Sequence, residues 1–115
     1  MTDETDFAGL TDRQLLSRRR GLAARVTRPE VTLPGALVHQ GRRCSSTGCR
    51  CRRGELHGPY SYLALYADGR NRTLYVPAAL EAVVADHVGV THANEAALGE
   101  IAQINVELLR RRALR

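Results

Sequence analysis

An Asp-Gly pair at positions 68 and 69 constrains the fold more than any other feature of the sequence. It separates two runs that are rich in tyrosine and aliphatic residues. Aspartate and glycine both tolerate a positive φ, which the favoured two-residue hairpin turns require. Residues 60–76 are therefore predicted to form two antiparallel strands. Because a two-residue turn also fixes the register, Tyr62 is expected to lie opposite Tyr75.

The alternation of side chains along these strands separates the residue types by face. One face is aliphatic and is expected to pack on helices, whereas the other collects every tyrosine in the protein. The aliphatic set is Leu63, Leu65, Leu74 and Val76, and the tyrosine set is Tyr60, Tyr62, Tyr66 and Tyr75. A shift of one residue in the register would exchange the two sets, so this prediction depends on the turn.

Helical apolar periods flank the strand region. Thr11 and Gln14 form a capping-box pattern at the start of a predicted helix over residues 11–27. After the strands, residues 78–88 and 92–113 predict a short helix and a long helix, with Gly89 ending the first.

Polar residues inside the apolar stripes predict how the helices pair. Arg19 lies within the stripe of the first helix and needs a partner there. Asn94 and Asn105 lie within the stripe of the longest helix, where a buried amide commonly fixes the register of paired helices. We expect the first and last helices to pack antiparallel, with Arg19 meeting Asn105, Glu100 or Glu107.

A chain of 115 residues can bury one modest core but not two. Residues 1–10 show no apolar period and are expected to be disordered. Residues 11–115 are expected to form one α+β domain. Its predicted sheet of two or three strands spans residues 35–77 and carries an inserted Cys/His loop at residues 41–59.

That loop holds three cysteines and a histidine within fourteen residues. Zn²⁺ prefers four such ligands in a tetrahedron, so a structural zinc ion is predicted on Cys44, Cys49, Cys51 and His57. The single residue between the second and third cysteines is a short spacing. His39 or His87 therefore stays open as a replacement ligand. Two other interpretations also stay open: the cysteines are ordinary thiols that bind no metal, or they have a redox role.

The positive charge of the chain is segregated. All seventeen basic residues are arginines, against twelve acids, and the net charge is +5. Arginines gather in residues 13–28 and 42–53 and are absent from residues 73–109, where acids prevail. Two interpretations stay open: a basic surface for phosphates, or basic and acidic helices that neutralise one another.

Two function classes are disfavoured by the sequence. No apolar stretch approaches the length of a membrane helix and the first residues are acidic, so a cytoplasmic protein without membrane contact is expected. No phosphate-binding loop, nucleophile elbow or zinc-protease motif occurs, so no enzymatic activity is expected.

The cysteine loop and the hairpin together resemble a family of small bacterial proteins of unknown function. The resemblance rests on Gly41-Arg-Arg-Cys44, on Cys49-Arg-Cys51-Arg-Arg-Gly54, and on the His57-Gly-Pro-Tyr60 segment before Tyr62. It covers residues 33–76. Where that family usually has Gly-Lys-Pro-x after the first cysteine, this chain has Ser-Ser-Thr-Gly and lacks the lysine. Genes of the family often lie near transposons, which implies contact with nucleic acid.

The sequence therefore predicts a nucleic-acid-binding accessory protein, with DNA as the expected partner and an association with mobile DNA. Arginine forks would contact phosphates, and the tyrosines would stack on bases or present a β-ribbon to a groove. The expected contact residues are Arg42, Arg43, Arg50, Arg52, Arg53, Arg70, Arg72, Tyr60, Tyr62, Tyr66 and Tyr75. The alternative is a helical interaction protein that forms a homodimer through its first and last helices, as in a coiled coil.

Overall fold

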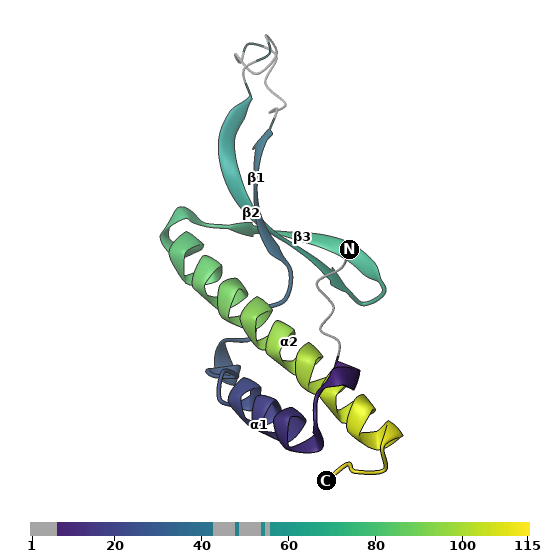
Figure 1. Cartoon of the computed structure of the whole chain (residues 1–115). Helices are drawn as coiled ribbons and strands as arrows, with labels where there is room; N and C mark the ends of the chain where they lie inside the picture. The colour runs from purple at the N-terminus through teal and green to yellow at the C-terminus, as the bar shows by residue number, and fades with distance from the viewer. Residues whose placement is uncertain (1–6, 43–47, 49–53, 55) are drawn as a thin grey trace. The chain divides into compact units, whose positions relative to one another are not determined.

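The structure is a computed structural model that describes residues 7–42, 48, 54 and 56–115. It divides into two compact units, which we call the helical unit (residues up to 30 and 92–115) and the sheet unit (residues 31–91). The elements in chain order are η1 (Phe7–Gly9), α1 (Asp12–Ala23), η2 (Pro29–Val31), β1 (Ala36–Arg42), β2 (His57–Ala67), β3 (Arg70–Val76), η4 (Ala78–Leu80) and α2 (Glu81–Arg110), as Figure 1 shows.

The sheet unit contains a three-stranded antiparallel sheet in the order β1-β2-β3. Its hairpin has the predicted register, with Tyr62 opposite Tyr75 and Ala67 opposite Arg70. Asp68 has a φ of 54° and Gly69 a φ of 79°, as a two-residue turn with positive φ at both positions requires. The Asp-Gly signal was therefore sufficient to place residues 61–67 of β2 against β3.

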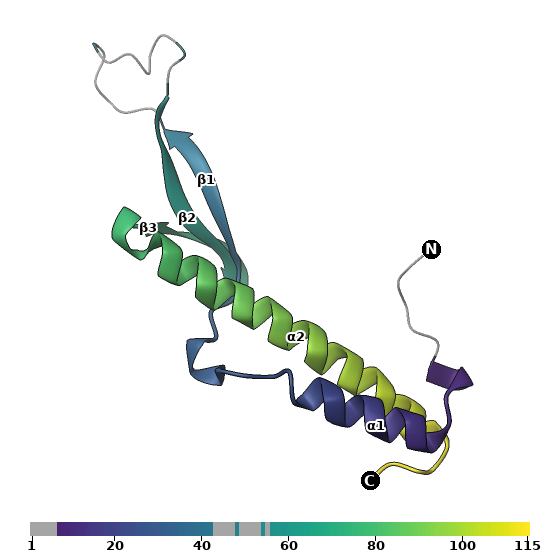
Figure 2. The same cartoon turned by 60° about the vertical axis from the view of Figure 1, so that its left-hand side comes forward.

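The pairing of β1 with β2 extends beyond the part of β2 that meets β3. β3 pairs with residues 61–67, whereas β1 reaches His57 through Arg42, after an irregularity between Gln40 and Arg42. Figure 2 shows the resulting two-stranded arm at the far end of β1 and β2. β1 continues to Arg42 because its backbone pairing extends through polar residues.

The aliphatic face of the sheet packs on the first turns of α2. Leu63, Val76 and Val88 form the buried cluster, and Val84 is among the half-buried side chains around it. Leu74 lies on the same face by alternation but is 55% exposed, so the cluster does not extend that far. The expectation that this face packs on a helix is confirmed.

In the helical unit, α1 runs antiparallel along the C-terminal part of α2 (Figures 1 and 2). The predicted capping box is present, with Thr11 Oγ1 accepting from the Gln14 backbone at 3.1 Å and Gln14 Oε1 accepting from the Thr11 backbone at 2.9 Å. The apolar seam between the helices is Leu15, Leu22, Ile104 and Leu108, with Phe7 at one end.

Polar contacts fix the pairing of these helices. Arg19 donates to Asn105 Oδ1 at 2.8 Å, one of the three expected partners, and Arg18 pairs with Glu100 at 2.8 Å. Asn94 is 8% exposed and bonds both backbone groups of Thr27, accepting from N–H at 3.1 Å and donating to C=O at 2.7 Å. The buried amide thus holds the chain just after α1 in place.

One predicted boundary is wrong, because Gly89 lies inside α2 instead of ending a helix. Neighbouring residues explain the continuity. Val88 is buried against the sheet, while the Thr91 hydroxyl donates to His87 O and accepts from the Leu33 backbone, each at 2.8 Å. A mid-helix glycine costs about 1 kcal/mol relative to alanine, less than this packing contributes.

In the described part of the chain, no helix is long and apolar enough to cross a membrane.

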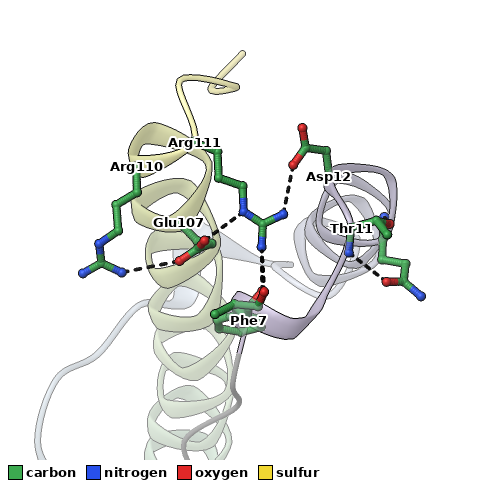
Figure 3. Close-up of polar contacts among 8 residues, drawn as sticks. Phe7, Thr11, Asp12, Glu107, Arg110 and Arg111 are labelled. Atoms are coloured by element: carbon green, nitrogen blue, oxygen red, sulfur yellow. Dashed lines mark hydrogen bonds and ion pairs between the residues drawn. The ribbon is translucent and has the colours of Figure 1, made fainter.

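A second correction concerns residues 7–10, which were expected to be disordered. Phe7 is 6% exposed within the helical seam, and its carbonyl accepts from Arg111 Nη2 at 3.1 Å (Figure 3). Arg111 also pairs with Glu107 at 2.8 Å and Asp12 at 2.9 Å. These partners raise the pKa of Arg111, and hydrogen bonding from Arg111 lowers the pKa of Glu107. Phe7 is a single apolar residue, so the sequence shows no periodic pattern that would predict the order of residues 7–10.

Candidate functional site

The face of the sheet opposite α2 carries a cluster of three tyrosines. The Tyr75 ring meets Tyr62 at 5.9 Å and Tyr60 at 6.4 Å, edge-on in both cases. Tyr62 is 7% exposed and forms the base of the cluster, whereas Tyr75 is 58% exposed. The guanidinium of Arg42 lies over the Tyr62 ring, 4.6 Å from its centroid, which brings a cation to this face.

A row of small side chains crosses the three strands beside this cluster. Ala36 opposes Ala64, and Ala64 opposes Thr73 on its other side. A groove of about 490 Å³ lies along this row, and its lining also includes Tyr66 and Asn71, which form the next cross-strand pair. Small residues here leave space that larger side chains would fill.

Tyr66 and Tyr75 bracket the row. Tyr66 is the most exposed of the four tyrosines, at 69%. Its cross-strand partner Asn71 is four residues from Tyr75 along β3, so the two aromatic positions are about 13 Å apart at the usual rise of a strand. Exposed aromatic rings with small residues between them can stack on flat ligands, and nucleobases are one such class.

The arginines of the hairpin do not join the tyrosines. By register Arg70 lies opposite Ala67 and Arg72 opposite Leu65, so strand alternation directs both to the other face. Arg72 pairs with Asp68 at 3.3 Å, and its Nε is buried without a hydrogen-bond partner. Among the predicted contact residues that the structure describes, Arg42 is the arginine that meets the tyrosines. Arg43, Arg50, Arg52 and Arg53 lie outside the described residues.

Of the predicted zinc ligands, too, only some lie within the described residues. His57 begins β2 opposite Arg42, and Cys44, Cys49 and Cys51 lie outside the described residues. Among residues 7–42, 48, 54 and 56–115, no group of three or more His, Cys, Asp or Glu side chains is arranged to hold a metal ion.

Of the two histidines weighed as replacement ligands, His39 lies in β1 and His87 lies in α2. His39 Nε2 lies 3.2 Å from Glu81 Oε1. His87 Nδ1 is buried and lies 3.8 Å from the Asp86 carboxylate, a distance too long for a hydrogen bond. Within the described residues, neither histidine belongs to a group of three or more such side chains that could hold a metal ion.

Sequence reasoning missed the polar contact between the sheet and the start of α2. Ser61 is 5% exposed and donates to Glu81 Oε2 at 2.8 Å, and His39 contacts the other carboxylate oxygen. The hydrogen bond from Ser61, followed by that from His39, lowers the pKa of Glu81. Because Ser61 and His39 both contact this carboxylate, the contact joins β1 and β2 to the first residue of α2. His39 and Ser61 are a cross-strand pair, a signal that becomes visible only once the β1 register is known.

Comparisons with known proteins reach the family level. No curated protein and no solved structure matches the chain. A family model described as a domain of unknown function, DUF6788, matches residues 12–85, from the start of α1 into the first turns of α2. This match covers more than half of the 115 residues, and the chain therefore belongs to the DUF6788 family.

Proposed function

We propose that this protein is a nucleic-acid-binding accessory protein that binds single-stranded DNA or RNA on the tyrosine face of its sheet. The observation that carries the proposal is the pair of exposed rings, Tyr66 and Tyr75, on either side of a row of small residues, with a groove along that row that Tyr66 helps to line. Stacking between bases and aromatic side chains tolerates any sequence, because every base has a flat face.

Charge supports this assignment. The chain carries a net charge of +5, and Arg42 adds a guanidinium beside the rings. The two-stranded arm leads from Arg42 into residues 43–53, which add Arg43, Arg50, Arg52 and Arg53. Phosphates along a strand bound across the tyrosines would be attracted to that end of the sheet.

Two of the four arginines of α1 contribute less. Arg18 and Arg19 are engaged with Glu100 and Asn105 inside the helical unit, and Arg111 is engaged with Asp12 and Glu107. Part of the charge segregation is therefore neutralised within the chain, as one of the two interpretations of the sequence expected. The proposed binding surface lies on the sheet unit for this reason.

The proposal includes a structural zinc ion in the loop between β1 and β2, held by Cys44, Cys49, Cys51 and His57. The support is the ligand set and its spacing in the sequence. A zinc ion there would close the end of the arm and fix the loop arginines relative to Arg42. Metal analysis of the purified protein should find about one zinc per chain, and a chelator should lower its melting temperature. A metal-free protein with an unchanged melting curve in chelator would refute this part.

The resemblance of residues 33–76 to bacterial proteins encoded near transposons adds a setting to the proposal. We place the protein beside mobile DNA, where single strands are exposed during strand transfer. This part rests on the sequence signature and is independent of the binding test below.

Fluorescence anisotropy of a labelled single strand and a matched duplex tests the binding proposal, at about 50 and 200 mM salt. The affinity should fall steeply with salt and favour the single strand. Replacing Tyr66 or Tyr75 by alanine should weaken single-strand binding about tenfold, whereas Tyr66→Phe keeps the ring and should bind normally.

Val83→Ala is a matched control, because Val83 is a 49% exposed apolar residue of α2 in the same unit. It should leave the affinity unchanged. Binding that is insensitive to both tyrosine substitutions would move the site away from the sheet face. An absence of binding to either strand form at micromolar protein would refute the proposed function.

A further inference from the structure

The helical unit exposes a second apolar stripe on α2, on the side away from α1. Ile104 and Leu108 are fully buried against α1, whereas Leu98, Val106 and Leu109 are 51%, 48% and 62% exposed. Spacings of three, four and eight residues place these three with Ala102 on one helix face. A monomer gains nothing from such a stripe.

One flank of the stripe is walled by η1. A groove of about 370 Å³ lies between this wall and the helix, with Phe7 and Ala8 on one side and Ala102 and Val106 on the other. The exposed face is therefore concave along this edge, a shape that suits another helix.

Opposite charges mark the two ends of the stripe. Glu95 is exposed at the N-terminal end. Arg110, at the other end, is 72% exposed and contacts Glu107 at 3.5 Å, while Arg111 holds the same carboxylate at 2.8 Å. Most of the Arg110 guanidinium is thus open to solvent. Its acidic neighbour Glu107 is already paired with Arg111.

We propose that a second copy of this chain packs antiparallel on this stripe about a two-fold axis. Glu95 and Arg110 are equally far from a midpoint between Ala102 and Gln103. A two-fold axis at that midpoint therefore places Glu95 of each copy beside Arg110 of the other. A parallel pair would bring like charges together, and a partner of uniform charge would match only one end.

The same two-fold axis also brings apolar residues of the two copies together. It sets Leu98 of one copy against the space between Val106 and Leu109 of the other, as a knob enters a hole. It also sets Gly99 against Val106 of the partner. Gly99 lies in mid-helix, and a Cβ there would meet nothing within 4 Å in the same chain. Internal packing does not require this glycine, whereas close approach of a second helix does.

Sedimentation equilibrium of the full chain tests the proposal over about 1 to 200 µM protein. The wild type should form dimers. Reversing either charge, by Glu95→Arg or Arg110→Glu, should weaken dimerisation about tenfold, because each places like charges together twice in the dimer. The double variant exchanges the charges and should restore the wild-type affinity within about threefold.

Matched controls make the same charge changes elsewhere in the helical unit. Glu30→Arg and Arg25→Glu alter exposed residues away from the stripe and should leave the dimer unchanged. Circular dichroism checks that each variant is folded. Gly99→Leu should abolish the dimer while keeping the helix content.

Three results would overturn the proposal. They are a wild-type chain that stays monomeric at every concentration, a dimer that is insensitive to both single reversals, and single reversals that the double variant does not rescue. The first of these results, combined with dimerisation once residues 1–6 are removed, would assign the stripe to that segment instead.

Discussion

The helical unit and the sheet unit are held together in different ways. In the helical unit, α1 and α2 meet through the seam of Leu15, Leu22, Ile104 and Leu108 and through polar side chains far apart in sequence. In the sheet unit, three strands pair through their backbones, and the buried cluster between sheet and α2 consists, among the residues described, of Leu63, Val76 and Val88.

This difference determines which substitutions each unit tolerates. Side chains specify the helical pair, so removing a methyl group or an amide there removes part of the structure. Backbone geometry specifies the sheet, so its weak points are the turns and close approaches of the chain. The predictions below test that contrast in order of expected effect.

Truncation of the helical seam should have the largest effect. Leu108 is fully buried, and Leu108→Ala should destabilise the protein by about 3 to 5 kcal/mol, because it leaves a cavity between two helices. Hydrogen exchange should show α1 losing protection while β2 and β3 keep theirs. Leu114→Ala, in the same unit and 48% exposed, serves as the control. Equal loss of protection in the sheet would show that the units unfold together.

In the sheet unit, the corresponding weak point is a glycine of the backbone, and its substitution should have the second-largest effect. Gly35 has a φ of 102°, and a Cβ there would run into the carbonyl of Ala64 and the side chain of Leu65. Gly35→Ala should cost about 3 kcal/mol, from strain and from displacement of β1. Thermal melts should rank it well below Gly69→Ala, which has a positive φ of 79° but open space around the new Cβ. Similar melting temperatures would show that strain, not the close approach, sets the cost.

The buried amide should rank third. Asn94→Ala leaves the N–H and C=O groups of Thr27 without their partner and should destabilise the helical unit by about 1 to 3 kcal/mol. Chemical denaturation measures this directly, with Asn71→Ala, at an exposed asparagine of β3, as the control. A change no larger than that of the control would mean that water replaces the amide without cost.

The smallest effect should be a pH dependence in the sheet unit. Because Ser61 and His39 lower the pKa of Glu81, the folded state binds the Glu81 proton more weakly than the unfolded chain does. The stabilisation is therefore complete above the unfolded pKa and is lost as the pH falls through the folded one. Glu81→Gln should lower the melting temperature at pH 7, and the gap from wild type should close in acid. Glu30→Gln, in the helical unit, should show no such closure.

The sequence predicted those parts of the fold that local chemistry decides. Asp68 and Gly69 fixed the turn, and with it the register and the two faces of β2 and β3. Arg19 in an apolar stripe required a partner, and Asn105 is one. In both cases a single residue type has few ways to be satisfied.

The parts it did not predict depend on contacts between distant segments. The loop between β1 and β2 has no fixed turn length, so the pairing of His39 with Ser61, and the approach of Glu81, had no local signal. Gly89 is a helix breaker by propensity, but packing of Val88 overrides it. Of the candidate site, the four tyrosines on one face were predicted, whereas the groove beside them and the position of Arg42 over Tyr62 involve β1, whose pairing had no local signal.

The pairing of α1 with α2 has a consequence for synthesis on the ribosome. The partner of Arg18 is made 82 positions later, and the three strands lie between the two helices in the chain. At about 5 to 20 residues per second, α1 waits on the order of 4 to 16 s for its seam. A lone helix of 12 residues is marginal in water, so Leu15 and Leu22 stay uncovered during that interval. Nascent chains should therefore bind hydrophobic-segment chaperones through α1 until translation passes Leu108.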